Sequence, residues 1–150
     1  KYFYRNSNGL IAKNKWISTK GKKSLEKNVV FTGYVNYDDI NYLYAIADLG
    51  VIPSIVNEAC PLTAIEMMAS GIPVICTNSG GLPELIDDKC GIIVDRTNLT
   101  QNLNQAIKKV YDNKELLENY SQNAKIRSQN FSREQYVANF WKYLEKFNKE

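Results

Sequence analysis

Short apolar runs rich in β-branched residues alternate along this chain with segments that repeat apolar residues at helical spacing. In residues 38–47, apolar side chains fall at positions i, i+3, i+4 and i+7, which places them on one face of a helix. Strands that alternate with helices are typical of a parallel sheet with helices on both faces. The sequence therefore predicts an α/β fold with a doubly wound, mostly parallel sheet.

The individual elements follow from the same patterns. Strands are predicted at residues 29–32, 49–52, 73–77 and 91–94, with a weaker candidate at 2–5. Helices are predicted at residues 38–47, 61–69, 82–86, 99–111, 114–128 and 133–147, with an uncertain one within 11–25. Pro61 suits the first position of its helix. The last helix is expected to bury its apolar face, which consists of Tyr136, Val137, Phe140, Trp141 and Leu144.

The amino-acid composition limits the catalytic and metal-binding groups that this chain can use. The 150 residues are 44% hydrophobic and 23% charged, which is ordinary for one globular domain. There is no histidine, so Ser-His-Asp and Cys-His catalysis and histidine-ligated metal sites are excluded. The three cysteines, Cys60, Cys76 and Cys90, form no C-x-x-C pair, which favours reduced thiols in the cytoplasm over a disulfide framework. General acid–base chemistry is left to Asp, Glu, Lys or Tyr.

Positive charge is concentrated near the N-terminus. Residues 1–28 contain eight Lys and Arg against the single acid Glu26, whereas the rest of the chain has more acidic than basic residues. A basic segment can bind nucleic acid, anionic lipid or phosphate groups. A solvated, lysine-rich helix face is the favoured interpretation, because the segment lacks the interleaved aromatics that stack on bases.

The most informative stretch is residues 53–66, which follows a predicted strand and opens a predicted helix. In parallel sheets ligands bind at the carboxyl ends of the strands. The first amides of a helix have no partner within it and carry positive partial charge, so they can bind an anion. Pro61 has no N–H, which leaves the amides of Leu62 and Thr63, together with Cys60, as donors to a phosphate group.

Glu66 extends this interpretation. Helical side chains lean toward the N-terminus, so Glu66 is directed toward Leu62 and Thr63. At about 1.5 Å per residue, a phosphate at the helix start would place an attached ribose near this carboxylate, which can accept two hydrogen bonds from a vicinal diol. No Lys or Arg lies three or four residues away to pair with it. A solvated helix position remains the alternative, and Glu58 has the same alternative as a loop acid.

Two glycine sites accompany the predicted strand ends. Gly33 follows the 29–32 strand and the pair Gly80 and Gly81 follows the 73–77 strand. Such glycines permit positive φ or a close approach of the backbone to a ligand, which makes all three candidate ligand-binding residues, although on their own they indicate only turns. The chain contains neither the G-x-G-x-x-G nor the G-x-x-x-x-G-K-[ST] pattern, which argues against dinucleotide dehydrogenases and P-loop NTPases.

Several short motifs occur together in one order and resemble a known family, the retaining glycosyltransferases with the GT-B fold. The group includes glycogen synthases, sucrose synthases and the group 1 glycosyltransferases of bacterial polysaccharides and lipids. The resemblance covers residues 29–147. The motifs are Tyr44-x-x-Ala47-Asp48, Pro53-Ser54, Glu58 and Glu66 with seven residues between them, Met68-Ala69-Ser70-Gly71-Ile72-Pro73-Val74-Ile75, Gly80-Gly81-x-x-Glu84 and Gly91-x-x-Val94.

The resemblance implies that residues 1–150 are the C-terminal, nucleotide-sugar-binding domain of such an enzyme, the Rossmann-like half of the GT-B fold. The first strand and helix of this domain and the N-terminal acceptor domain would be missing. In the family, the acid that matches Glu66 holds the ribose and the acid that matches Glu58 contacts the donor sugar at the reacting centre. The turn between them meets the diphosphate and sugar, and the edge that matches Gly33 and Tyr34 contacts the base.

The resemblance also implies the activity. It indicates transfer of a hexosyl group from a nucleotide sugar to a glycan or lipid acceptor, with retention and without a metal or other cofactor. No nucleic-acid partner is expected. The location is expected to be either the cytoplasm or the inner face of the membrane by peripheral association, and the isolated chain is expected to be inactive.

One departure from the family pattern concerns the turn, which is Ala59-Cys60-Pro61-Leu62 where the family has Gly-Phe-Gly-Leu; it leaves fewer free amides. Two other functions remain open. One is a non-catalytic nucleotide-binding or interaction module of the same fold. The other is a sugar-nucleotide epimerase, which the absence of histidine disfavours.

Overall fold

The computed structural model describes residues 29–30 and 32–147. The predicted elements at 2–5 and 11–25 and the basic segment 1–28 therefore lie outside the described residues. The chain divides into two units, one ending at Leu43 and the other beginning at Tyr44, and each is described by itself.

In the first unit, the prediction of a strand at 29–32 is wrong, because Val29, Val30 and Thr32 are not part of any strand. β-branched residues favour a strand only where a neighbouring strand is available to pair with it. Helix α2 (Tyr37–Tyr44), whose last residue belongs to the second unit, begins close to its predicted start, with Asp38 and Asp39 in its first turn. It ends three residues earlier than predicted, in a turn that the amide of Ala47 closes on the carbonyl of Tyr44.

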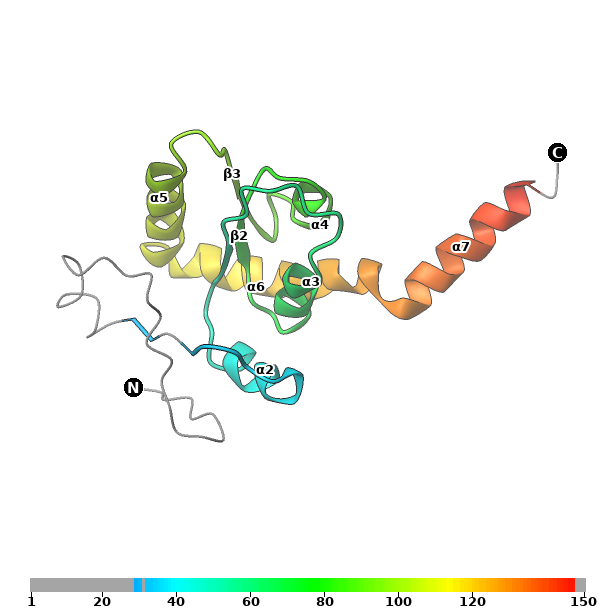
Figure 1. The fold of residues 1–150 in the computed structure, drawn as a ribbon, viewed down its shortest axis with the longest axis horizontal. Coiled ribbons are helices and arrows are strands. Elements are labelled where there is room, and N and C mark those ends of the chain that lie inside the picture. The colour runs from blue at the N-terminus through cyan, green and yellow to red at the C-terminus, as the bar shows by residue number, and fades with distance from the viewer. Residues whose placement is uncertain (1–28, 31, 148–150) are drawn as a thin grey trace. The chain divides into compact units, whose positions relative to one another are not determined.

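The second unit is built on a three-stranded parallel sheet in the order β1-β2-β3 (Figure 1). The strands are β1 (Gly50–Ile52), β2 (Val74–Thr77) and β3 (Gly91–Val94). The register pairs Gly50 with Val74 and Val74 with Gly91, so the three strands begin nearly level. The α/β fold class with a parallel sheet is confirmed.

Helices connect the strands and follow them. They are α3 (Leu62–Ala69), α4 (Leu82–Leu85), α5 (Leu99–Tyr111), α6 (Lys114–Ser128), a 3-10 turn (Gln129–Phe131) and α7 (Arg133–Phe147). Helices α5, α6 and α7 have the bounds that the sequence predicts. Pro61 is the N-cap of α3 rather than its first residue, because its ψ of 97° is extended while its carbonyl already accepts from the amide of Ala64.

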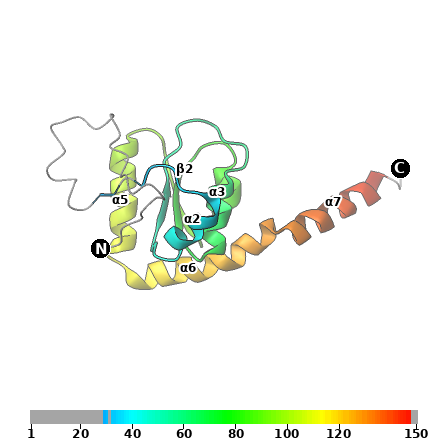
Figure 2. The same cartoon turned by 60° about the horizontal axis from the view of Figure 1, so that its bottom comes forward.

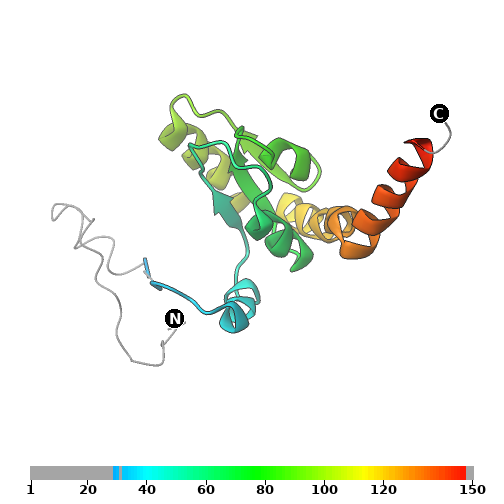
Figure 3. The same cartoon turned by 45° about the vertical axis from the view of Figure 1, so that its right-hand side comes forward.

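The two faces of the sheet are covered by different helices (Figures 1 and 3). On one face, Val74 and Cys76 of β2 pack with buried residues of α3 and α4. On the other face, Ile75 packs with α5 and with Val94 of β3. Successive side chains of a strand point to opposite faces of the sheet. All four residues of β2 are buried, which shows that both faces of the sheet are covered at this strand.

Helix α6 passes under the amino ends of the strands (Figure 2). The hydroxyl of Ser121 donates to the carbonyl of Gly71 at 2.6 Å, and the side-chain amide of Asn123 donates to the carbonyl of Lys89 at 3.1 Å. Both carbonyls lie just before a strand begins. This arrangement leaves the opposite edge, where the strands end, free of α6.

The predicted burial of the α7 face is wrong. None of the residues of α7 is buried in the structure, and Tyr136 and Trp141 are 71% and 61% exposed. Within the second unit, α7 extends away from the sheet and contacts the 3-10 turn before it (Figure 1). The amphipathic pattern correctly predicts the helix, but burial of its face requires a surface that the described residues of this unit do not offer. Among the described helices, none combines the length and apolar character needed to cross a bilayer.

Candidate functional site

The three strands end at one edge of the sheet, and their loops meet there. Residues 53–61 follow β1 and lead into α3, residues 78–81 follow β2, and residues 95–98 follow β3. Carboxyl-edge loops of parallel sheets are where ligands bind. The loop 53–61 is central to the candidate site because it carries Glu58 and ends at the start of α3.

Hydrogen bonds from the end of β2 and from the two neighbouring loops fix this loop along its length. The donors include Thr77 and Ser79, both of which are almost completely buried. Four carbonyl oxygens of the loop accept: Ser54 from the Thr77 hydroxyl at 2.6 Å, Ile55 from Arg96 at 3.3 Å, Val56 from the Ser79 hydroxyl at 2.5 Å and Glu58 from the Gly81 amide at 2.7 Å. Buried polar groups satisfied in this way define one conformation of the backbone.

Gly80 and Gly81 are required by the same loop. A Cβ on Gly80 would lie 2.1 Å from the carbonyl oxygen of Glu58, and a Cβ on Gly81 would lie 2.1 Å from that of Ala59. Gly80 also has a φ of +52°, which favours glycine. The glycine pair predicts a close approach of the backbone to a ligand here. The structure shows that the approaching group is the chain itself, and a contact of these glycines with the donor stays a prediction.

Glu58 is half-buried and has a partner four residues away. The hydroxyl of Ser54 donates to its Oε1. The carbonyl of Ser54 accepts from Thr77 at the end of β2, and the carbonyl of Glu58 accepts from the amide of Gly81. Because the backbone of both residues is held in this way, the direction of the Glu58 carboxylate is fixed.

The start of α3 has the features of an anion site. Its N-cap, Pro61, makes no side-chain hydrogen bond, and the first turn contains no acidic residue. By helix geometry, the amides of Leu62 and Thr63 have no partner inside the helix. Both residues are exposed, as is Cys60 just before them. Cys60, Leu62 and Thr63, which are predicted to meet a diphosphate, are therefore close together along the chain and open to solvent within this unit, whereas Pro61 between them is buried.

Glu66 lies on the face of α3 opposite the buried Ala64 and Met68. No Lys or Arg lies three or four residues away from it, so a partner for this carboxylate has to come from outside the helix. The structure provides a tertiary one, because the hydroxyl of Tyr44 donates to Glu66 Oε2 at 2.9 Å. Glu58 and Glu66 thus have separate partners, Ser54 and Tyr44.

Gly33 and Tyr34 belong to the first unit. Gly33 has a φ of +68°, so the positive φ expected of it is present. The side chain of Tyr34 is 84% exposed. Their contact with a nucleotide base stays a prediction.

Sequence reasoning missed four residues that shape the site: Tyr44, Thr77, Ser79 and Arg96. Tyr44 is expected from the sequence on the apolar face of its helix and in the motif Tyr44-x-x-Ala47-Asp48, without a role toward Glu66. Thr77 and Ser79 carried a usable signal, because hydroxyl residues at the end of a fully buried strand need a hydrogen-bond partner. Nothing local indicates the role of Arg96, whose contacts with Ile55 and Asn57 span about forty residues of sequence.

The thiols differ in their environments. Burial raises the pKa of Cys76 to about 12 and that of Cys90 to about 11, whereas Cys60 is exposed. In residues 29–30 and 32–147, no group of three or more Cys, Asp or Glu side chains is arranged to hold a metal ion.

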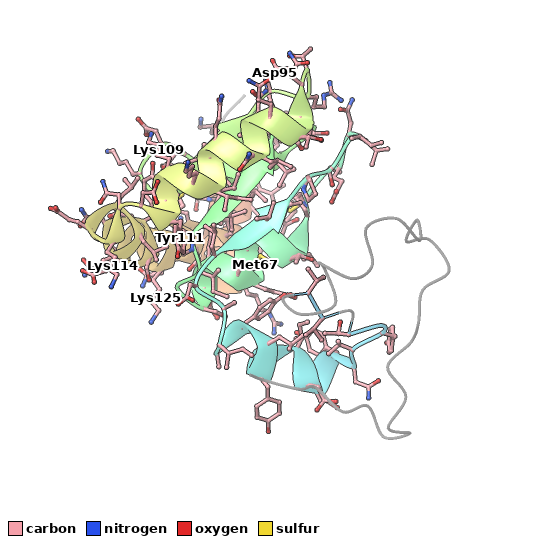
Figure 4. All side chains as sticks on the ribbon, turned by 90° about the vertical axis from the view of Figure 1, so that its left-hand side faces the viewer. Met67, Asp95, Lys109, Tyr111, Lys114 and Lys125 are labelled. Carbon is pink, nitrogen blue, oxygen red and sulfur yellow. The ribbon has the colours of Figure 1, made fainter. Side chains whose placement is uncertain are left out.

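A cavity of about 370 Å³ lies elsewhere in the second unit, between β3 and α5. Asp95 and Lys109 line it and lie toward opposite ends of α5 (Figure 4). None of the residues predicted for the site contributes to its lining.

Solved structures share this fold, among them the following two. Sucrose-phosphate synthase from Thermosynechococcus elongatus aligns with a TM-score of 0.71 and 28% identity, over 85% of this chain and 32% of that chain. The C-terminal domain of a group 1 glycosyl transferase from Francisella tularensis aligns with a TM-score of 0.65 and 29% identity, over 74% and 57% of the two chains.

The sequence comparisons agree. YtcC of Bacillus subtilis, which is named as a glycosyltransferase, is 29% identical over 128 residues, covering 77% of this chain and 31% of YtcC. The chain thus spans about a third of the length of this relative. The model of the family "Glycosyl transferases group 1" matches residues 11–127, which is most of the chain. On the match of fold, motifs and family model, the chain belongs to the group 1 glycosyltransferases.

Proposed function

We propose that this chain is the C-terminal, donor-binding part of a retaining glycosyltransferase that acts without a metal ion. The protein that contains it would transfer a hexosyl group from a nucleotide-diphosphate sugar to a hydroxyl of a glycan or lipid. The observation that carries the proposal is the arrangement at the carboxyl edge of the sheet. There, a fixed loop presents Glu58 and leads directly into the open start of α3, and Glu66 lies one turn further along.

Each element of this edge has a role in the proposal. The amides of Leu62 and Thr63, beside Cys60 and Pro61, bind the diphosphate. The helix dipole contributes about 0.3–1 kcal/mol to this binding, so cationic side chains from elsewhere in the protein are also needed. Glu66 accepts hydrogen bonds from the ribose hydroxyls. The contact of Gly33 and Tyr34 with the base rests on the family resemblance alone.

Glu58 orients the donor sugar during transfer. The bond between the anomeric carbon and the phosphate oxygen breaks, and the acceptor oxygen bonds to that carbon on the same face. The acceptor proton passes to the departing phosphate. Negative charge that develops on this phosphate is stabilised by the amides at the start of α3. Glu58 is thereby the catalytic residue of this chain.

The activity also depends on a part of the enzyme outside this chain and on where the enzyme works. The acceptor would be held by a separate N-terminal domain, so the isolated chain would bind nucleotide weakly and catalyse no transfer. The protein would work in the cytoplasm or at the inner face of the membrane, without nucleic acid as a partner.

The test is a thermal-shift panel on the full-length protein with UDP-, GDP- and ADP-sugars. We expect one nucleotide class to raise the melting temperature, and Glu66→Ala to remove most of that shift. Glu118→Ala, which removes an exposed glutamate of α6, is the matched control and is expected to keep the shift. If no nucleotide raises the melting temperature, or if Glu66→Ala responds like the control, the site assignment is wrong.

A second experiment separates an enzyme from a binding module. Glu58→Gln is expected to retain the thermal shift but to lose at least about 100-fold in transfer rate, the size typical for loss of a group that acts on the transition state. A wild-type protein that binds a nucleotide sugar but transfers no sugar to any glycan or lipid acceptor would identify a non-catalytic module instead.

A further inference from the structure

The hydroxyl of Tyr44 donates a hydrogen bond to Oε2 of Glu66 at 2.9 Å. Tyr44 is 8% exposed and is the first residue of the second unit, so donor and acceptor belong to the same unit, 22 residues apart in sequence. A hydrogen bond to an ionised carboxylate is stronger and more directional than one between neutral groups. The bond therefore fixes where one of the two carboxylate oxygens lies.

Little else on α3 can orient this side chain. The residues three and four positions from Glu66 are Leu62, Thr63, Ala69 and Ser70, none of which carries a positive charge. Ser70 bonds only to the main-chain carbonyl of Glu66, through both its amide and its hydroxyl. A glutamate has three side-chain torsions, so without a partner its carboxylate would occupy several positions on the exposed face of the helix.

The hydrogen bond from Tyr44 uses only part of the hydrogen-bond acceptor capacity of the Glu66 carboxylate. An ionised carboxylate has about four acceptor positions on its two oxygens. The Tyr44 hydroxyl occupies one of them on Oε2, which leaves all of Oε1 for the adjacent hydroxyls of a ribose. A group already held in its binding orientation loses less conformational freedom when the ligand arrives.

We infer that Tyr44 is a positioning residue that holds Glu66 ready for a ribose diol and thereby raises selectivity for ribonucleotides over 2′-deoxyribonucleotides. This inference rests on the proposed function, since it assigns Glu66 to the ribose. Tyr44 itself does not contact the nucleotide. Its effect is confined to ligands whose hydroxyls bond to Glu66.

The experiment compares the dissociation constants of UDP, GDP and ADP with those of their 2′-deoxy analogues on the full-length protein by calorimetry. The selectivity ratio is the dissociation constant of the deoxy form divided by that of the ribo form. We expect Tyr44→Phe to lower this ratio about three- to tenfold, the size expected for freezing one long side chain. The loss should come from weaker ribonucleotide binding, with 2′-deoxynucleotide binding within about twofold of wild type.

Tyr120→Phe is the matched control. Tyr120 on α6 is also 8% exposed, but it packs with the core residues on the face of the sheet that α5 covers, away from Glu66 on α3. It is expected to leave the ratio unchanged. Glu66→Gln is expected to lower the ratio further than Tyr44→Phe does. Adding Tyr44→Phe to Glu66→Gln should then change the ratio no more, because a residue that acts through Glu66 loses its effect when that carboxylate is gone.

The outcomes distinguish this inference from the proposed function. Equal weakening of ribo and deoxy forms by Tyr44→Phe would show a purely structural role, and tighter ribonucleotide binding would show that Tyr44 competes with the ribose. Either result, or a selectivity ratio that Tyr44→Phe leaves unchanged, overturns the inference. The proposed function still stands in these cases if Glu66→Gln lowers the selectivity ratio. If Glu66→Gln retains the wild-type ratio, or if no nucleotide binds to the wild-type protein, both are overturned.

Discussion

The buried hydroxyl of Thr77 donates a 2.6 Å hydrogen bond to the carbonyl oxygen of Ser54, joining the last residue of β2 to the loop that follows β1. Thr77 has no exposed surface. The bond is the first of the four that fasten the loop 53–61, and it lies closest to the sheet. It links a side chain of the rigid core to the conformation of the loop that carries Glu58.

Thr77→Val removes this donor and keeps the shape of the side chain. The carbonyl of Ser54 then loses its partner in a partly buried position, which costs about 1–3 kcal/mol. We expect urea-induced unfolding to show a loss of stability in this range. Thr100→Val, at an exposed position of α5, should change stability by less than about 0.5 kcal/mol. Equal effects of the two substitutions would contradict a structural role for the Thr77 hydrogen bond.

Gly81→Ala tests the close approach of the two loops. The new Cβ would meet the carbonyl oxygen of Ala59 at 2.1 Å, so the loop 53–61 must move to accommodate it. We expect a loss of about 1–3 kcal/mol in the free energy of unfolding, as for other overpacked sites. We also expect weaker binding of nucleotide sugars, measured by calorimetry, because the moved segment leads into α3. Asn78→Ala, at an exposed position in the same loop, should leave both measurements near wild type.

Much of the fold is predictable from local patterns. The bounds of α5, α6 and α7 follow from helical periodicity and, for α7, from the capping residue Ser132, whose hydroxyl accepts from the amide of Gln135. The apolar run of β2 predicts a strand buried on both faces. These signals are reliable because each is contained within a few residues of the chain.

The failures share a different cause. The apolar faces of residues 29–32 and of α7 carry the right propensity for a strand and a helix, but pairing and burial depend on surfaces distant in sequence. The same holds for the site. The position of Glu66 on α3 follows from helix geometry, whereas its hydrogen bond with Tyr44 spans 22 residues and has no local signature.

Asp87, in the loop between α4 and β3, has a lowered pKa whose effect on stability can be measured by varying the pH. Burial alone would raise the pKa of Asp87, but hydrogen bonds from the Cys90 thiol and the Lys89 amide, together with the charge of Arg127, lower it overall. The guanidinium of Arg127 lies 3.5 Å from this carboxylate. A carboxyl whose pKa is lower in the folded state stabilises the fold above the unfolded pKa of about 3.9, and this contribution disappears as pH falls through the folded value.

Asp87→Asn should therefore destabilise the protein at pH 7, by up to about 1 kcal/mol for a partly exposed ion pair. The difference from wild type should shrink as the pH is lowered from 5 toward 3. Urea unfolding at several pH values measures it. Asp88→Asn, at the exposed neighbouring position, corrects for the general loss of one negative charge. A difference that stays constant between pH 7 and pH 3 would contradict the lowered pKa.

The three thiols should react at very different rates. The thiolate is the reactive form, and burial raises the pKa of Cys76 to about 12 and that of Cys90 to about 11, while Cys60 is exposed before α3. With iodoacetamide at pH 8, peptide mass spectrometry should show Cys60 modified at least about 100-fold faster than the other two. In concentrated urea the three rates should become similar.

A saturating nucleotide sugar should slow the reaction of Cys60 alone, since the proposed diphosphate position adjoins it. Native labelling of Cys76 or Cys90 as fast as that of Cys60 would contradict the burial of this core, and an unprotected Cys60 in the presence of bound donor would place the diphosphate away from α3.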